Sequence, residues 1–451
     1  MKSRRIRETL TRRAALKTAF FGAAGLAILG RHGMPAWAGE TVPATKRGGK
    51  AKAVIELWMA GGPAHIDTFD PKPGAGPEYT GPLAKAIPTN APGVQLNESL
   101  PLLAQQADKF SIIRSLTHGV NAHETAAYIV QTGRRPGSGA GAERVYPSFG
   151  AVASMFLGQG YQGMIPPYVV LTRPQGRFAV EGFLGIQHKP FVTGGDPRRD
   201  RFAVEGVVLD GVSDEQQRSR RELLHDLDSL GKALKGDPTF EKMNECEEKA
   251  YDLILGDAGK VFDLNQETKE VRDRYGRTTF GQSCLVARRL VEAGVPYITV
   301  NSGGWDTHKR HFESMRQKLP DLDRGFSALL EDLGQRGMLD STLVWWAGEF
   351  GRTPRVQMEE PWNGGRSHFG PVFSAVVAGG GFKGGHVVGA SDERAMEVDE
   401  RPVYAHDLHG SMYELLGVDP DGPLPNPRGL DVSVTAPSDK GAHKGRLKEI
   451  M

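Results

Sequence analysis

The chain has 451 residues, of which 39% are hydrophobic and 24% are charged. This composition is typical of a globular protein and excludes wholesale disorder and a fibrous repeat. The formal net charge of the whole chain is +2, but the first 38 residues hold most of the basic excess.

Residues 1–38 have the three parts of an export signal. Arginines and lysines precede an uncharged stretch from Ala19 to Leu29, and Ala36-Trp37-Ala38 matches a small-residue cleavage site. The Arg12-Arg13 pair resembles the twin-arginine pattern, so we expect transport by the twin-arginine translocase and a periplasmic or secreted protein. The apolar stretch is too short to span a bilayer, and we expect no stable membrane anchor.

Removal of residues 1–38 takes away eight Lys/Arg and one Glu, which leaves a net charge of −5. The mature chain then lacks the basic excess of a nucleic-acid-binding protein. Cys246 and Cys284 are the only cysteines, so neither a disulfide framework nor a thiolate zinc site is available.

Along the chain we expect a polar leader at 39–52, one large domain at 53–435 and a basic tail at 436–451. Between residues 213 and 276 the chain becomes rich in charge, with apolar residues at helical spacing. This pattern predicts a helical insertion in the domain.

Short apolar runs alternate with amphipathic segments through the domain. The runs predict strands at Ala53–Met59, Phe110–Ser115, Tyr168–Leu171, Tyr297–Val300, Ser341–Ala347 and Val372–Ala378. The other segments predict helices at Leu100–Asp108, Ala122–Gln131, Thr279–Ala293, Phe312–Gly334 and His406–Leu416. The alternation predicts an α/β fold with a doubly wound, mostly parallel sheet and helices on both faces, in which ligands bind at the carboxyl ends of the strands.

Acids and histidines gather in four loops that we expect to follow strands. The four groups are His65, Asp67 and Asp70; Asp306, His308 and His311; Glu349 with Arg352; and His368. Carboxylate and imidazole together suit zinc or manganese. We therefore predict a hydrolytic metal site, in which a divalent cation polarises an ester oxygen.

Several of these residues have a structural alternative. Asp70-Pro71 could simply start a turn. His311 could be a solvated residue at the start of a helix. Glu349 could form a salt bridge with Arg352. Asp306 and His308 follow a Gly-Gly turn, and their side chains project the same way if the backbone is extended. This placement favours a metal site over a purely structural role for these two residues.

The segment from Ser115 to Thr125 lies between a predicted strand and a predicted helix. A nucleophile placed there can use the helix N-terminus to stabilise an anion. The alternative is simple capping of that helix by Asn121.

Three motifs carry a resemblance to a known family: Leu57 to Pro73, Gly303 to His308, and Gly348 to Pro354. They are similar to the exported bacterial proteins called domain of unknown function 1501, within the alkaline phosphatase/sulfatase-like superfamily. The resemblance extends over about Ala53 to Asp421 and implies an alkaline phosphatase-like fold.

The resemblance also implies roles for individual residues. Asp306 and His308 resemble the superfamily's paired metal ligands after one core strand. Glu349 resembles the carboxylate after the next strand, and His368 resembles the histidine that comes late in the superfamily's sequences. Asp67 or His65 would replace the first-strand aspartate. The nucleophile position falls on His123, where the superfamily has serine or threonine; Thr117 and Thr125 are nearby.

From these observations we expect an exported metal-dependent hydrolase of phosphate or sulfate esters, acting on an anionic substrate such as a sulfated or phosphorylated glycan. The expected ligands of the divalent cation (zinc, with manganese or calcium as alternatives) are Asp67, Asp306, His308, Glu349 and His368. Arg352 would bind the substrate anion through two donors, and His123 would lie where attack begins. The alternative is a catalytically inactive exported binding protein, for instance for sulfated polysaccharide, that keeps the fold.

Overall fold

The computed structural model describes residues 48–137, 145–176, 179–199, 202, 204, 216, 219, 257–436 and 445–451. All of them belong to one unit, Ala44–Met451. The predicted export signal, most of the leader, Cys246 and most of the predicted insertion lie outside the described residues. Within the described ranges, no helix has the length and apolar character needed to cross a membrane.

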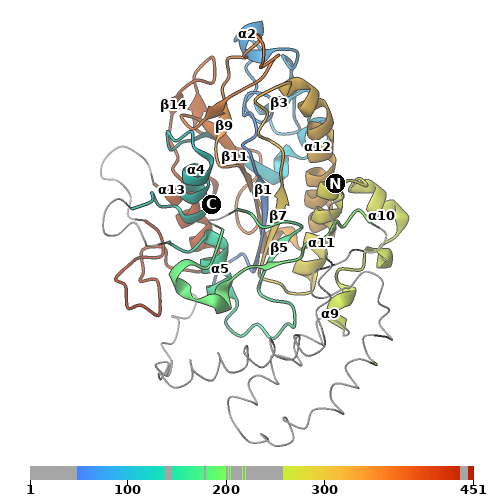
Figure 1. The fold of residues 1–451 in the computed structure, drawn as a ribbon, viewed down its shortest axis with the longest axis vertical. Coiled ribbons are helices and arrows are strands. Elements are labelled where there is room, and N and C mark those ends of the chain that lie inside the picture. Colours follow the sequence, from blue (N-terminus) through green and yellow to red (C-terminus); the bar gives the residue numbers. More distant parts are fainter. Residues whose placement is uncertain are drawn as a thin grey trace, which may run out of the picture. The chain divides into compact units, whose positions relative to one another are not determined.

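Eight strands of the described chain form the central sheet (Figure 1). Their order across the sheet is β12 (Val387–Val388), β4 (Phe110–Leu116), β11 (Phe373–Ala378), β8 (Thr342–Ala347), β1 (Ala53–Met59), β7 (Tyr297–Ser302), β5 (Tyr168–Leu171) and β6 (Phe191–Val192). Their pairings are parallel except those of β11, which runs antiparallel to both β4 and β8. The predicted α/β class and mostly parallel sheet are confirmed.

Helices cover both faces of the sheet (Figure 1). One group contains α4 (His123–Thr132), α5 (Phe149–Leu157) and α13 (Ala405–Leu415), and the other α11 (Thr279–Glu292) and α12 (His311–Gln335). The predicted Leu100–Asp108 helix is two short turns, α3 (Pro101–Ala104) and η1 (Ala107–Lys109). Helix α5 was not predicted, because its residues are almost all apolar and buried and therefore show no amphipathic period.

Strand β1 lies at the centre of the sheet, and its side chains alternate between the two helical layers. Ile55, Leu57 and Met59 belong to the main hydrophobic core. Glu56 lies on the opposite face, fully buried, and accepts a hydrogen bond of 2.7 Å from Gln131 of α4. Burial raises the pKa of Glu56, although hydrogen bonds from Gln131 and three further side chains oppose this shift.

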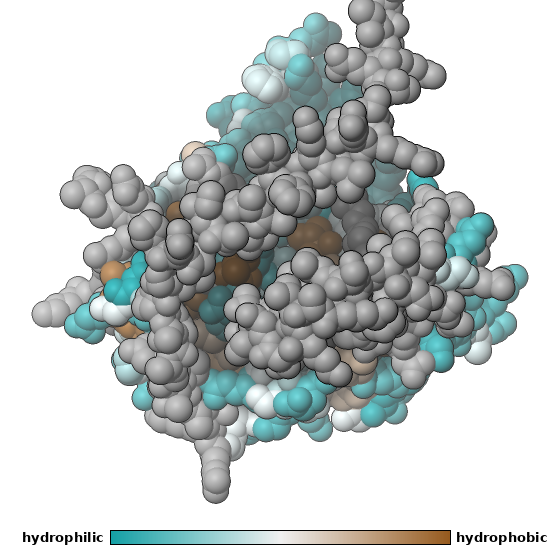
Figure 2. All heavy atoms as spheres, turned by 60° about the horizontal axis from the view of Figure 1, so that its bottom comes forward, coloured by the Kyte–Doolittle hydropathy of each residue, from teal (hydrophilic) through white to brown (hydrophobic). Residues whose placement is uncertain are grey.

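Three two-stranded ribbons and some short helices complete the described chain. The ribbons are β2 (Ala86–Pro88) with β3 (Gln95–Asn97), β9 (Gly351–Arg352) with β10 (His368–Phe369), and β13 (Ala390–Ser391) with β14 (Val398–Glu400). The short helices include α2 (Pro77–Thr80), and, at the end of the predicted insertion, α9 (Asp257–Lys260) and α10 (Lys269–Arg274). In Figure 2, which brings the lower end of Figure 1 forward, the described atoms in view are mostly hydrophilic, and some apolar side chains show near the middle.

The last described residues, 445–451, pack on the domain. Leu447 and Ile450 are buried, and the Leu447 N–H donates to Ser411 Oγ of α13 at 2.8 Å. This end of the predicted basic tail is therefore anchored by buried apolar side chains and a hydrogen bond.

Candidate metal centre

Four segments that are far apart in the sequence meet at the carboxyl edge of the sheet. Asp306 follows β7 and Glu349 follows β8, whereas His123 is the first residue of α4 and His368 the first of β10. His368 reaches this edge although it precedes a sheet strand, because β11 is antiparallel and therefore begins where its neighbours end.

Three of these residues form a cluster that fits a cation. His123, Asp306 and His368 each offer one ligand atom, and the three atoms lie within 4.8 Å of one another. Asp306 Oδ2 lies 3.2 Å from His123 Nε2, and Asp306 Oδ1 lies 3.1 Å from His368 Nε2. We call these three residues the metal cluster.

His308 stands beside the metal cluster. Its Nε2 lies 3.1 Å from Asp306 Oδ1 and 2.8 Å from His368 Nε2. In a tetrahedral zinc site, bonds of about 2.0–2.2 Å place the ligand atoms roughly 3.3 Å apart. The separations from the Asp306 oxygens, 3.1–3.2 Å, are close to this value, whereas His308 Nε2 and His368 Nε2 are closer together, at 2.8 Å. The set of imidazoles with one carboxylate suits zinc or manganese.

Glu349 lies behind His123 rather than at a free position for coordination. Its Oε1 accepts a hydrogen bond of 2.6 Å from His123 Nδ1, and both carboxylate oxygens receive the Gly61 N–H, at 2.9 and 3.1 Å. A carboxylate that accepts a hydrogen bond from one ring nitrogen of a histidine fixes the tautomer of the ring. It also fixes the direction in which the other ring nitrogen points. The structure thus gives Glu349, expected as a ligand, the geometry of a residue that orients a ligand.

Gly61 makes this arrangement possible. Its φ is 114°, and a Cβ at this position would lie 2.3 Å from the backbone nitrogen of Asp306. Only glycine therefore allows the loop after β1 to approach both the Asp306 loop and the Glu349 carboxylate.

Arg352 differs from its expected role. Its guanidinium is fully buried and hydrogen-bonds to Asp306, to the Gly61 carbonyl, and to the Gly62 carbonyl at 3.1 Å. It pairs with Asp306 rather than with Glu349, so the alternative of a Glu349–Arg352 salt bridge is wrong. The expectation that Arg352 binds a substrate anion also needs correction, because the guanidinium is inaccessible and its donors are engaged.

The charges around Asp306 keep it ionised. Burial would raise its pKa, but the hydrogen bond and positive charge of Arg352 outweigh burial and lower the pKa to about 2. At His123 the hydrogen bond to Glu349 raises the pKa, whereas burial lowers the pKa of the neighbouring His308. A carboxylate that stays charged at neutral pH is ready to hold a cation.

Asp67 lies apart from the metal cluster in a buried ion-pair network. Its oxygens contact Arg366 Nη2 at 3.0 Å and His311 Nε2 at 2.8 Å. All three side chains are fully buried. Asp67 was expected to coordinate the metal, but both of its oxygens already contact Arg366 or His311, so the structure corrects this expectation. The expectation of a solvated His311 is wrong, because its side chain is buried.

The other residues of the first loop are also structural. Asp70 is buried, and its Oδ1 lies 3.2 Å from Lys72 Nζ and 3.4 Å from Arg114 Nε. His65 is buried against Phe369, and its Nε2 contacts the Ala395 carbonyl oxygen at 2.9 Å.

Asn121 has a role that the sequence analysis missed. The N-cap residue of α4 is Ala122, without a side-chain cap, so capping by Asn121 is wrong. Instead, Asn121 Oδ1 accepts from the Gly370 N–H at 2.7 Å, and its carbonyl oxygen lies 2.8 Å from His368 Nδ1. Asn121 thereby holds the hairpin that carries His368, and its closeness to His123 in the sequence was the available signal.

A cavity of about 220 Å³ adjoins the metal cluster. His123 and Glu349 line it on one side, and Trp58, Gln131 and Gln175 line it elsewhere. The cavity is large enough for the organic part of a small ligand bound next to the cluster.

The fold and the site together define an α/β protein with a candidate metal centre at the carboxyl edge of a mostly parallel sheet. The family model described as "Protein of unknown function (DUF1501)" matches residues 51–444. The chain belongs to this family. No curated protein matches its sequence.

Several solved structures are similar to the chain, all at low identity. Ps i-CgsB in complex with k-i-k-neocarrahexaose is 13% identical, with a TM-score of 0.38 over 81% of this chain and 72% of that one. The lipoteichoic acid synthase LtaP from Listeria monocytogenes is 10% identical, with a TM-score of 0.38 over 88% and 76%. The C-terminal periplasmic domain of EcEptC from Escherichia coli, a complex with Zn, is 11% identical, with a TM-score of 0.33 over 89% and 95%.

Proposed function

We propose that the protein is an exported metal-dependent hydrolase of phosphate or sulfate esters. The observation that carries this proposal is the metal cluster: ligand atoms of His123, Asp306 and His368 converge within 4.8 Å at the edge where α/β sheets bind ligands. His308 would complete the set on the Asp306 side. Zinc fits these ligands, and manganese or calcium are the alternatives.

The surrounding residues prepare the metal cluster for a cation. Glu349 holds His123 Nδ1, so that Nε2 faces Asp306. Arg352 fixes Asp306 from the buried side and keeps it ionised. A bound divalent cation would supply Lewis acidity toward an ester oxygen and lower the pKa of water.

The substrate class follows from the charge and shape of the site. A cation held mainly by neutral imidazoles and one carboxylate keeps positive charge and attracts an anionic ester. The adjoining cavity would take the organic part of that ester, for instance a sugar of a sulfated or phosphorylated glycan. Trp58 lines this cavity together with two glutamine side chains, a mixture that suits a ring carrying hydroxyl groups.

One observation favours the second candidate, a catalytically inactive exported binding protein for a polymer such as sulfated polysaccharide. His123 occupies the expected nucleophile position, but both of its ring nitrogens contact carboxylates, at 2.6 and 3.2 Å. It is therefore placed as a ligand rather than as a free nucleophile. Such a protein would keep the fold without turnover.

Metal content and turnover separate the two candidates. We would measure zinc, manganese and calcium in the purified protein by elemental analysis, together with Asp306→Ala and the matched surface control Asp399→Ala. We expect about one equivalent of metal in the wild type and the control, and a loss in Asp306→Ala. Less than about half an equivalent in the wild type would contradict the metal site.

A panel of aryl phosphate and sulfate esters then tests the reaction. Turnover that disappears in Asp306→Ala and persists in Asp399→Ala supports the hydrolase. Bound metal without turnover of any ester favours the binding protein, and turnover that Asp306→Ala leaves unchanged rules out this site.

A further inference from the structure

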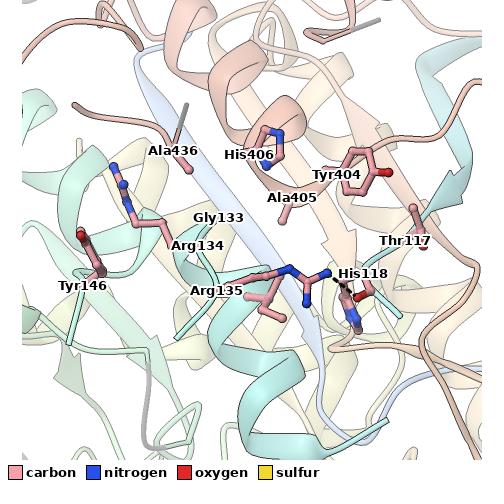
Figure 3. Close-up of a pocket in the computed structure, with 11 residues that line it drawn as sticks. Thr117, His118, Gly133, Arg134, Arg135, Tyr146, Tyr404, Ala405, His406 and Ala436 are labelled. Atoms are coloured by element: carbon pink, nitrogen blue, oxygen red, sulfur yellow. Dashed lines mark hydrogen bonds between the residues drawn. The ribbon is translucent and has the colours of Figure 1, made fainter. Parts of the chain in front are cut away.

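A second pocket lies at the other end of α4, beyond its last turn (Figure 3). Its volume is about 250 Å³. We call it the Arg135 pocket. The residues that line it include Thr117, Arg134, Arg135, Tyr146, Tyr404 and His406. None of them belongs to the metal cluster, and His118 lies between the two sites, with its Nε2 2.7 Å from the Glu349 carbonyl oxygen.

The two arginines follow directly on the end of α4. Gly133, with φ of 69°, ends the helix in the left-handed conformation, and the chain turns there. Arg134 then lies over the Tyr146 ring, 4.5 Å from its centroid, and donates to the Ser433 carbonyl oxygen. Arg135 extends across the pocket, and its Nη2 donates to the His118 carbonyl oxygen at 2.9 Å (Figure 3).

Neither guanidinium has a counter-ion in the described part of the chain. Both side chains donate to backbone carbonyl oxygens, Arg134 also lies over an aromatic ring, and neither forms an ion pair with another described residue. A carbonyl oxygen satisfies an N–H donor but leaves the positive charge uncompensated. Two positive charges that no described carboxylate neutralises, on residues that line one cavity, attract an anion.

The start of α13 closes the opposite side of the pocket. Tyr404, Ala405 and His406 line it, and the first turn of an 11-residue helix adds a partial positive charge. Asp407 offsets part of this charge, since its carboxylate accepts from the Tyr404 N–H at 3.1 Å and lies 3.6 Å from His406 Nε2. The arginines are therefore the main source of positive potential.

We propose that the Arg135 pocket binds a tetrahedral oxyanion, a phosphate or sulfate group, as a site separate from the metal cluster. The Arg135 guanidinium, which extends across the pocket, supplies donors in a planar fork that matches the oxygens of such an anion, and Arg134 adds positive charge (Figure 3). Thr117 and Tyr146 also line the pocket, and each carries a hydroxyl group that can donate a hydrogen bond. This binding site does not depend on the proposed hydrolase activity.

The test is a calorimetric titration of the full protein with inorganic sulfate and with inorganic phosphate. Metal is removed with chelator, and the titration is repeated on Asp306→Ala, so that the metal cluster cannot hold the anion. Arg135→Gln is the test variant, because Arg135 is exposed and its replacement does not endanger folding. Arg198→Gln is the matched control, since Arg198 is an exposed arginine paired with Asp196 at 3.4 Å.

We expect one saturable site that survives chelation and Asp306→Ala, weakens at least tenfold in Arg135→Gln, and is unchanged in Arg198→Gln. Arg135→Lys, which keeps the charge but not the fork, should fall between wild type and Arg135→Gln. No saturable binding, or binding that Arg135→Gln leaves unchanged, overturns the proposal. Binding that is lost in Asp306→Ala and kept in Arg135→Gln overturns it as well, because it assigns the anion to the metal cluster.

Glucose 6-sulfate and glucose 6-phosphate distinguish the source of the anion. If either binds more tightly than the inorganic ion, the pocket holds a charged group on a larger molecule. If the inorganic ion binds as tightly or more tightly, the ligand is the free anion. Both results support the oxyanion site, and they identify which form it takes.

Discussion

Glu349 Oε1 accepts a hydrogen bond from His123 Nδ1 at 2.6 Å, across 226 positions of sequence. The bond joins the loop after β8 to the first residue of α4. It is the contact that turns His123 Nε2 toward Asp306, and it raises the pKa of His123.

Glu349→Gln keeps the size of the side chain but removes its charge. We expect zinc affinity to fall by about 10- to 100-fold, the usual effect of losing a carboxylate behind a histidine ligand. Competition with a chromophoric chelator measures the change, and exposed Glu393→Gln is the control. Equal affinities in the wild type and Glu349→Gln would show that Glu349 does not support a ligand.

Asp67 should matter for stability and not for metal content. Removing one partner of a buried ion pair costs about 3–5 kcal/mol, so Asp67→Asn, which leaves the buried Arg366 without its carboxylate, should lower the free energy of unfolding by about that amount. Urea unfolding gives the stability and elemental analysis gives the metal. A loss of metal with unchanged stability would instead favour the expectation, drawn from sequence, that Asp67 is a ligand.

His368 and His308 should differ in their effect on metal binding. His368 belongs to the metal cluster, whereas His308 stands beside it on the Asp306 side. We expect His368→Ala to abolish stoichiometric binding and His308→Ala to weaken it by a smaller factor, both measured by equilibrium dialysis with zinc. The reverse order would place the cation between Asp306 and His308 and redefine the cluster.

Stability should fall in acid partly because of His409. This side chain is buried in α13 next to Phe149, and burial, with some repulsion from His406 and Arg134, lowers its pKa to about 3. The unfolded chain takes up the proton near pH 6.5 and the folded chain does not, so the contribution is lost as pH falls below 6.5. Between pH 7 and pH 5 this costs about 2 kcal/mol.

The variant His409→Gln tests this account, because glutamine does not titrate. Between pH 7 and pH 5, the free energy of unfolding should fall in both proteins, but the fall should be about 2 kcal/mol smaller in His409→Gln than in the wild type. Urea denaturation at the two pH values measures both drops. Parallel pH dependence in the two proteins would mean that His409 does not contribute to acid sensitivity.

Export is a prediction from residues 1–38 alone. Replacing Arg12 and Arg13 with lysine keeps the charge but removes the twin-arginine pair, and we expect the precursor to accumulate in the cytoplasm. Cell fractionation with a blot against the protein gives the result. Normal export of the double variant would argue against the twin-arginine route.

Local patterns were sufficient for much of the secondary structure. The predicted bounds of β1 and β5 are those of the structure. Helix α4, predicted at Ala122–Gln131, runs from His123 to Thr132, and Gly133 ends it in the left-handed conformation. Such features depend on hydrophobic runs and on glycine at a helix end, both of which are encoded within a few residues. Helix α5 escaped notice because a helix that is buried on all sides has no amphipathic period.

Sequence by itself determined that acids and histidines follow strands of an α/β sheet, because strand ends can be recognised locally. Only the tertiary structure decided which of them meet. Asp67 and Asp306 look alike in their loops, and each pairs with a buried arginine. However, Asp67 is enclosed by Arg366 and His311, whereas Asp306 also faces His123 and His368. The difference arises from the antiparallel direction of β11 and from the close approach at Gly61, which are long-range contacts that no short segment specifies.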